Sequence, residues 1–122
     1  MKRFGLVVVA AALAGIGPAA AQSIDLTKIY GDEFGCINKD GQEVVVDKML
    51  LLKEGNLVTA MSACEIKSQK PGKGGALVIS TVCEDGDGSS KVDFTISKAK
   101  KKSVFAVKDA DGNLMGQVAQ CR

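Results

Sequence analysis

Cysteine is the residue type in this sequence whose spacing most clearly predicts chemistry. The chain contains four cysteines, Cys36, Cys64, Cys83 and Cys121. No two of them form a Cys-x-x-Cys pair, which counts against a thioredoxin-like redox site and against a zinc cluster. An even number of well-separated cysteines in a short exported chain is typical of a disulfide framework. We therefore expect two disulfides, for which three pairings are possible.

The stretch between Cys64 and Cys83 favours one of these pairings. Two apolar runs flank a glycine-rich bend, which is typical of a β-hairpin. A two-residue turn at Lys73-Gly74 would place Cys64 directly opposite Cys83 in an antiparallel pair. The sequence therefore predicts a Cys64–Cys83 disulfide, which leaves Cys36 to pair with Cys121.

The first arm of this hairpin is expected to be one unbroken strand over residues 57–67. Successive side chains of a strand alternate between its two faces. In this interpretation Cys64 shares the inner face with Val58, Ala60 and Ile66.

Catalytic chemistry has few candidates in this chain. Histidine is absent, which removes the usual general base and a common metal ligand. A hydrolase using two carboxylates would need two members of an acidic set to converge in a cleft. That set is Asp32, Glu33, Glu84, Asp85, Asp109 and Asp111. Adjacent residues of a strand point to opposite faces, so neighbouring acidic residues such as Asp32 and Glu33 would not converge. We therefore predict no enzyme, no catalytic residue and no cofactor.

Two acidic loops, 85–89 and 109–113, carry alternating aspartates that could supply oxygen ligands to calcium. Neither loop has the EF-hand spacing, and Asp-Gly is also common hairpin-turn chemistry. We therefore predict two turns and no metal site.

The beginning of the chain has the parts of a secretory signal peptide. Lys2 and Arg3 precede an apolar run over residues 4–17, and small residues follow Pro18. The apolar run is shorter than the roughly 20 residues that span a bilayer, so no membrane anchor is expected after cleavage. We predict a signal peptide over residues 1–21, a single domain over residues 22–122, and a periplasmic or secreted location.

The charge balance excludes general affinity for nucleic acid. The chain has 16 basic and 14 acidic side chains, and loss of Lys2 and Arg3 with the signal peptide makes the two kinds equal. One basic cluster remains, over residues 98–102. It lies between two strand-like runs, so we expect a solvated hairpin turn in preference to a binding patch.

Short β-type runs separated by glycine-containing turns predict an all-β fold. Residues 31–37 are expected to form a loop that leads into a strand, and residues 25–30 a short strand or one helical turn. The clearest alternation places Val92, Phe94 and Ile96 inward. The predicted strands cover residues 43–47, 48–53, 57–67, 76–83, 92–97, 103–108 and 113–121.

The predicted architecture is a small antiparallel meander that closes into a barrel and is stapled by two disulfides. A two-sheet sandwich is the alternative. The apolar strip of Met49, Leu50, Leu51, Leu52 and Met61 could line a ligand cavity, but core packing explains it better.

The order of cysteine motifs resembles that of small four-cysteine secreted proteins of Gram-negative bacteria. The motifs are a Gly-x-x-x-Gly-Cys ending at Cys36, an Ala-Cys-Glu around Cys64, Cys83, and a terminal Gln-Cys-Arg. This resemblance implies a periplasmic β domain without a defined activity. The architecture is also similar to that of periplasmic inhibitors of c-type lysozyme. Their Ser-Gly-x-x-Tyr loop is missing here, so no inhibitory residue is carried over.

These observations together predict a non-catalytic binding module that recognises another periplasmic protein, a host protein or a cell-envelope component through its loops. The alternatives are a lysozyme-inhibitor-like protein, a barrel that holds an apolar ligand and, least favoured, a small carboxylate hydrolase.

Overall fold

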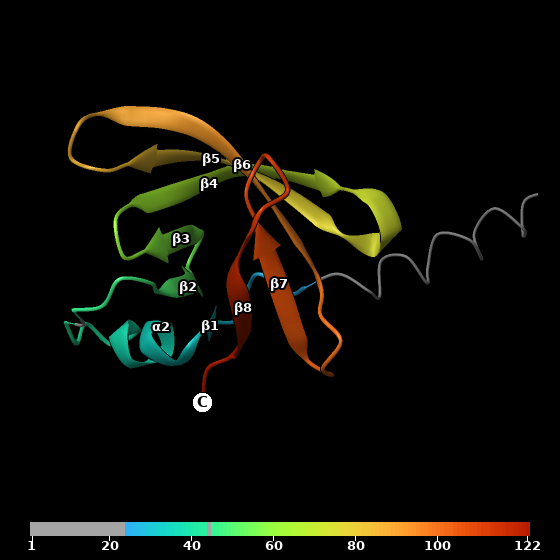
Figure 1. Cartoon of the computed structure of the whole chain (residues 1–122), viewed down its shortest axis with the longest axis horizontal. Helices are drawn as coiled ribbons and strands as arrows, with labels where there is room; N and C mark the ends of the chain where they lie inside the picture. The colour runs from blue at the N-terminus through green and yellow to red at the C-terminus, as the bar shows by residue number, and fades with distance from the viewer. Residues whose placement is uncertain (1–23, 44) are drawn as a thin grey trace, which may run out of the picture.

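Eight antiparallel strands, connected in chain order, close into a barrel in the computed structural model, which describes residues 24–43 and 45–122 (Figure 1). The predicted all-β barrel is confirmed, and the alternative sandwich is not formed. The predicted signal peptide lies outside the described residues. The elements are β1 (Tyr30–Gly31), α2 (Glu33–Asn38), β2 (Leu50–Lys53), β3 (Asn56–Thr59), β4 (Ala63–Pro71), the short 3-10 helix η1 (Lys73–Gly75), β5 (Leu77–Glu84), β6 (Ser89–Lys98), β7 (Val104–Lys108) and β8 (Leu114–Gln120).

Both predicted disulfides are present. Cys36 is bonded to Cys121 and Cys64 to Cys83, with Cα–Cα distances of 5.4 and 3.8 Å. The second bridge lies inside the barrel, where Cys64 is fully buried. The first joins α2 to the residue that follows β8, and so ties the start of the barrel to its end.

The β4–β5 hairpin has the predicted pairing at its cysteines but a different turn. Cys64 lies opposite Cys83. The predicted two-residue turn is wrong, because residues 72–76 form a wider loop in which the Gly72 amide donates to the Ala76 carbonyl at 2.8 Å. This wider loop alone would shift the pairing by one residue. An extra residue, Lys67, lies at the register shift between Ile66 and Ser68 and restores the pairing of the cysteines.

The predicted single strand over residues 57–67 is also wrong. It divides into β3 and β4 at a tight turn, in which the Thr59 amide donates to the Ser62 carbonyl at 2.8 Å. Leu57 therefore lies opposite Cys64 and is fully buried, whereas Val58 is half-buried and Ala60 belongs to the turn. The turn changes which residues face inward, and continuous alternation cannot reveal that change.

The predicted buried strand around Leu50–Leu52 is confirmed as β2, and the helical alternative is not formed. A two-residue turn at Glu54-Gly55 connects β2 to β3, with both residues at positive φ as a type I′ hairpin requires. Met61 was assigned to the same apolar strip, and that assignment is wrong, because its side chain is 80% exposed.

A short helix, α2, replaces the predicted loop over residues 31–37. Asp32 begins the helix, and its Oδ1 accepts a hydrogen bond from the Gly35 amide at 2.7 Å. Gly31 and Gly35 allow the helix to approach the barrel closely, since an added Cβ at Gly35 would lie 1.8 Å from the Leu50 carbonyl oxygen. The helix packs against β1 and β2 (Figure 1).

The predicted strand over residues 43–47 is not formed by the described residues there, 43 and 45–47. Valine is common in strands, but mainly because its side chain packs well on the half-buried surface of a sheet. The segment lies between α2 and β2, and Val45 is 92% exposed. Residues 25–28 form a turn, and the first strand begins at Tyr30.

The interior of the barrel is filled by side chains from most of its strands. Phe94 and Ile96 face inward as predicted, and Val92 packs against the core while partly exposed. The lysine-rich segment joins β6 to β7 as the predicted exposed turn. The most deeply buried side chains are Leu52, Leu57, Cys64, Ile79, Ile96, Val107 and Val118.

Candidate functional site

An open cleft of about 300 Å³, lined by both polar and apolar residues, lies where the approach to β2, the β3–β4 turn and the start of β8 come together. We refer to it as the methionine cleft, because three of its lining residues are methionines. The cleft is lined by Asp32, Asp47, Lys48, Met49, Leu50, Thr59, Ala60, Met61, Leu114 and Met115.

The shortness of β1 explains where the cleft forms. Strand β1 pairs with β8 only at Ala119 and Gln120, so it does not reach the first residues of β8. Leu114 and Met115 belong to this uncovered part of β8 and line the cleft. On the floor Leu50 is 3% exposed, and its Cδ1 lies so near Gly116 that an added Cβ there would be 2.9 Å away.

The β3–β4 turn holds Met61 at the rim of the cleft. The Thr59 hydroxyl oxygen accepts hydrogen bonds from the amides of Met61 and Ser62, at 3.2 and 3.0 Å. The Thr59 and Ser62 hydroxyls are also 3.0 Å apart. The backbone of the turn is therefore held in place while the Met61 side chain projects into solvent.

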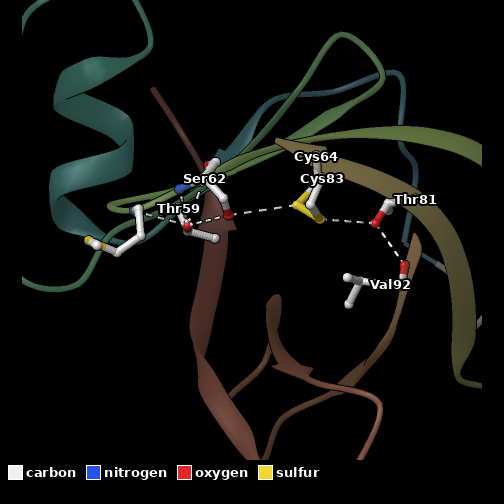
Figure 2. Close-up of a disulfide and its surroundings, with 7 residues drawn as sticks. Thr59, Ser62, Cys64, Thr81, Cys83 and Val92 are labelled. Atoms are coloured by element: carbon white, nitrogen blue, oxygen red, sulfur yellow. Dashed lines mark hydrogen bonds between the residues drawn. A yellow bond between two sulfur atoms is a disulfide. The ribbon is translucent and has the colours of Figure 1, made fainter. Parts of the chain in front are cut away.

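A chain of polar contacts connects this turn to the barrel interior (Figure 2). The Ser62 hydroxyl lies 3.8 Å from Cys64 Sγ, and the Thr81 hydroxyl lies 3.4 Å from Cys83 Sγ. Thr81 is 2% exposed, and its hydroxyl donates to the Val92 carbonyl at 2.7 Å. The disulfide therefore lies directly behind the turn that carries Met61.

Two exposed apolar residues line the methionine cleft. Met61 is 80% exposed and Leu114 is 58% exposed, although both are large apolar side chains. The charged residues that line the cleft are Asp32, Asp47 and Lys48. Exposed apolar side chains that gather around a hollow are characteristic of interaction sites.

The two acidic loops form turns, as predicted. Asp85 Oδ1 accepts from the Asp87 amide at 3.1 Å, and Asp109 Oδ1 accepts from the amides of Asp111 and Asn113 at 3.0 and 2.9 Å. These carboxylates therefore serve the backbone of their own turns. Within residues 24–43 and 45–122 no three His, Cys, Asp or Glu side chains are grouped so that they could hold a metal ion.

The six candidate carboxylates lie in three separate places. Asp32 and Glu33 lie at the start of α2, Glu84 and Asp85 at the end of β5 and directly after it, and the last two candidates between β7 and β8. Figure 1 shows these three regions well apart. The structure does not bring the six groups together in one cleft, and Asp32 is the member that lines the methionine cleft.

Two surface carboxylates have shifted pKa values. The Thr27 hydroxyl and amide donate to Asp25 Oδ1, at 2.6 and 3.0 Å, and lower the pKa of Asp25. The ammonium group of Lys39 lies 2.7 Å from Asp40 and lowers the pKa of Asp40. Both carboxylates are exposed and neither lines the methionine cleft.

Leu114 and Met115 were not predicted as site residues, and Met61 was predicted to pack in the core. The methionine cleft joins residues 47–50, 59–61 and 114–115, whose proximity depends on barrel closure. A turn signal at Thr59 and Ser62 was the one local indication that Met61 would project from the surface.

No family model, curated protein or solved structure matches this chain. Two disulfides are typical of a protein that folds in an oxidising compartment outside the cytoplasm. None of the helices in the described part of the chain has the length and apolar character needed to cross a membrane.

Proposed function

We propose that this protein is a non-catalytic binding module, exported to the periplasm or secreted, that recognises another protein through the methionine cleft. The observation that carries this proposal is the exposure of Met61 and Leu114, 80% and 58%, two large apolar residues that line the same open cleft. Burying these side chains against a partner would contribute favourable free energy through the hydrophobic effect.

The openness of the cleft favours a protein partner over a small apolar ligand. Sites for small molecules bury most of the ligand surface, which requires an enclosing pocket. Here the interior of the barrel is filled by its own side chains, and the cleft lies on the outside. An apolar side chain that projects from a partner's surface fits this geometry better than a free ligand does.

The rigidity of the scaffold supports recognition without a catalytic step. The turn that carries Met61 is fixed by the hydrogen bonds of Thr59, and the Cys64–Cys83 disulfide lies behind it. A surface ordered before binding loses less conformational entropy on association. Methionine side chains are flexible and polarisable, so they adapt to a partner's shape while the backbone stays fixed.

The remaining hypotheses have less support. A carboxylate hydrolase requires two converging acids, and the six candidates lie in three separate regions of the fold. Lysozyme inhibition is one particular case of protein recognition, so the experiment described next includes lysozyme as a partner.

The proposal is tested by capture on four immobilised proteins: the oxidised wild type, Met61→Asp, Leu114→Asp and Val45→Asp. Val45 is 92% exposed and does not line the cleft, so Val45→Asp introduces the same charge at a matched surface position. Periplasmic extract and a lysozyme-containing fluid are passed over each surface, and retained proteins are identified by mass spectrometry.

We expect a stoichiometric partner that binds wild type and Val45→Asp and is lost from both cleft variants. Equal retention on all four surfaces would show that the cleft is not the binding site. Retention of nothing by the wild type would overturn the proposal.

A further inference from the structure

Three methionines from three separate segments meet in one cleft. Met49 precedes β2, Met61 lies in the β3–β4 turn, and Met115 is the second residue of β8. The chain has four methionines, and the fourth is Met1. Every methionine in the described residues therefore lines the same cleft, although the lining set has ten members.

Thioether sulfur is the one kind of soft metal ligand that this chain offers. The sequence has no histidine, and its four cysteines are all consumed in the two disulfides. Soft thioether and thiolate ligands select soft ions such as Cu(I), whereas carboxylates select hard ions such as Ca²⁺. The carboxylates of the two acidic loops accept hydrogen bonds from the backbone of their own turns, and these loops do not line the methionine cleft.

We propose that the methionine cleft binds a soft monovalent metal ion, Cu(I) or its analogue Ag(I), through the thioether sulfurs of Met49, Met61 and Met115. Met49 is 7% exposed, and Met115 packs partly buried against the core, so these two ligands are anchored. Met61 is the mobile third ligand, because its side chain is 80% exposed on a fixed turn and is free to fold over the ion.

The charges around the cleft are compatible with a cation. Asp32 and Asp47 line the cleft with carboxylates, and Lys48 is the opposing charge. The lining residues thus carry one more negative than positive charge. Leu50 and Leu114 also line the cleft, so part of its surface is apolar, and an apolar surround lowers the local dielectric of a metal site.

Metal binding at the cleft does not depend on the proposed protein partner. Methionine-to-leucine variants distinguish metal binding from protein binding. Leucine has nearly the volume and apolar character of methionine but no sulfur, and such exchanges are usually well tolerated in a core. Met61→Leu should therefore keep any protein partner and weaken metal binding, whereas Met61→Asp should lose the partner.

The test uses the oxidised full-length chain labelled with ¹³C at the methionine methyl groups. Silver nitrate is added in chloride-free buffer and the methyl resonances are followed by NMR; Cu(I) affinity is then measured anaerobically by competition with a chromogenic chelator. We expect the methyl signals of Met49, Met61 and Met115 to shift together and to saturate at one ion per chain. Each single Met→Leu variant should weaken binding by about tenfold or more.

Two controls identify the ligands. Val45→Ala removes an exposed apolar side chain that does not line the cleft, so it should leave the metal affinity unchanged. The triple Met→Leu variant keeps Met1 and should bind no more tightly than free methionine.

The proposal is overturned if Ag(I) shifts no methyl signal, if it shifts Met61 alone, or if Met61→Leu binds as tightly as the wild type. Met61 is exposed, so Met61→Leu gives a decisive result even if a variant at buried Met49 fails to fold.

Discussion

At Gly35 the absence of a side chain determines where α2 can lie. A Cβ at this position would lie 1.8 Å from the carbonyl oxygen and 2.7 Å from the carbonyl carbon of Leu50. Both atoms are backbone, so neither can move aside without displacing β2. A Cβ added at Gly31, four residues earlier, would lie 3.0 Å from the same oxygen.

We predict that Gly35→Ala lowers the free energy of unfolding by about 3 kcal/mol, because overpacking must displace either the helix or the strand. Chemical denaturation measures the change. Ile37→Ala is the matched control in the same helix, because Ile37 is 41% exposed and its truncation should cost much less. Equal effects of the two substitutions would contradict this account of Gly35.

Asp25 offers a prediction about pH at the scale of a single residue. Its folded-state pKa lies below the ordinary value because the Thr27 hydroxyl, and then the Thr27 amide, donate to the carboxylate. A lowered folded-state pKa stabilises the folded protein at pH values above the unfolded-state pKa. This stabilisation is lost as the pH falls through the folded-state pKa. Thr27→Val should raise the pKa of Asp25 and Thr27→Ser should preserve it, as measured by an NMR titration of the carboxyl carbon.

Among the elements, the β3–β4 turn shows how one side chain organises a loop. The Thr59 hydroxyl accepts from the amides of Met61 and Ser62. We predict that Thr59→Val, which keeps the shape but removes the hydroxyl, costs about 1 to 2 kcal/mol of stability. Thr59→Ser keeps the hydroxyl and should cost less. Thermal unfolding of the two variants tests the ranking, and a larger loss for serine would contradict it.

The barrel could be predicted from sequence because its strongest signals are local. The alternation at Phe94 and Ile96, and the placement of Cys64 and Cys83 about a glycine-rich bend, needed no knowledge of distant contacts. The errors arose where two local irregularities compensate. The wider loop and the extra residue at Lys67 shift the register in opposite senses, so the cysteine pairing was predicted correctly with the wrong turn.

The helix and the cleft could not be predicted in the same way. Asp32, followed by Glu33, is a helix-start signal, but a six-residue helix is stabilised mainly by packing, and the packing of α2 depends on β2. The methionine cleft depends on barrel closure, which brings residues near 49, 61 and 115 together. The spacing of these three methionines in the sequence does not predict that they line the same cleft.

For the molecule as a whole, the two disulfides constrain the unfolded chain to different degrees. The Cys36–Cys121 bridge spans 85 residues and the Cys64–Cys83 bridge spans 19. Loop-closure entropy gives them about 4.6 and about 3.3 kcal/mol of stabilisation.

We predict that Cys36→Ala/Cys121→Ala raises the urea m-value more than Cys64→Ala/Cys83→Ala, because it releases the longer loop in the unfolded state. The m-value separates this effect from the packing that is lost when buried Cys64 is truncated. A larger rise for the shorter bridge would contradict the prediction.

The two-residue length of β1 has a consequence for motion. Barrel closure depends on two residue pairs with β2 and two with β8, so this seam is where the fewest backbone hydrogen bonds must break. The Cys36–Cys121 bridge lies beside the seam and limits how far the two sides can separate. We therefore expect opening of the barrel to begin at this seam, near which Leu50 of β2 and Leu114 and Met115 of β8 line the methionine cleft. An occupant of the cleft that contacts both β2 and β8 would bind the closed barrel more tightly than an opened one. Binding would therefore stabilise the closed barrel.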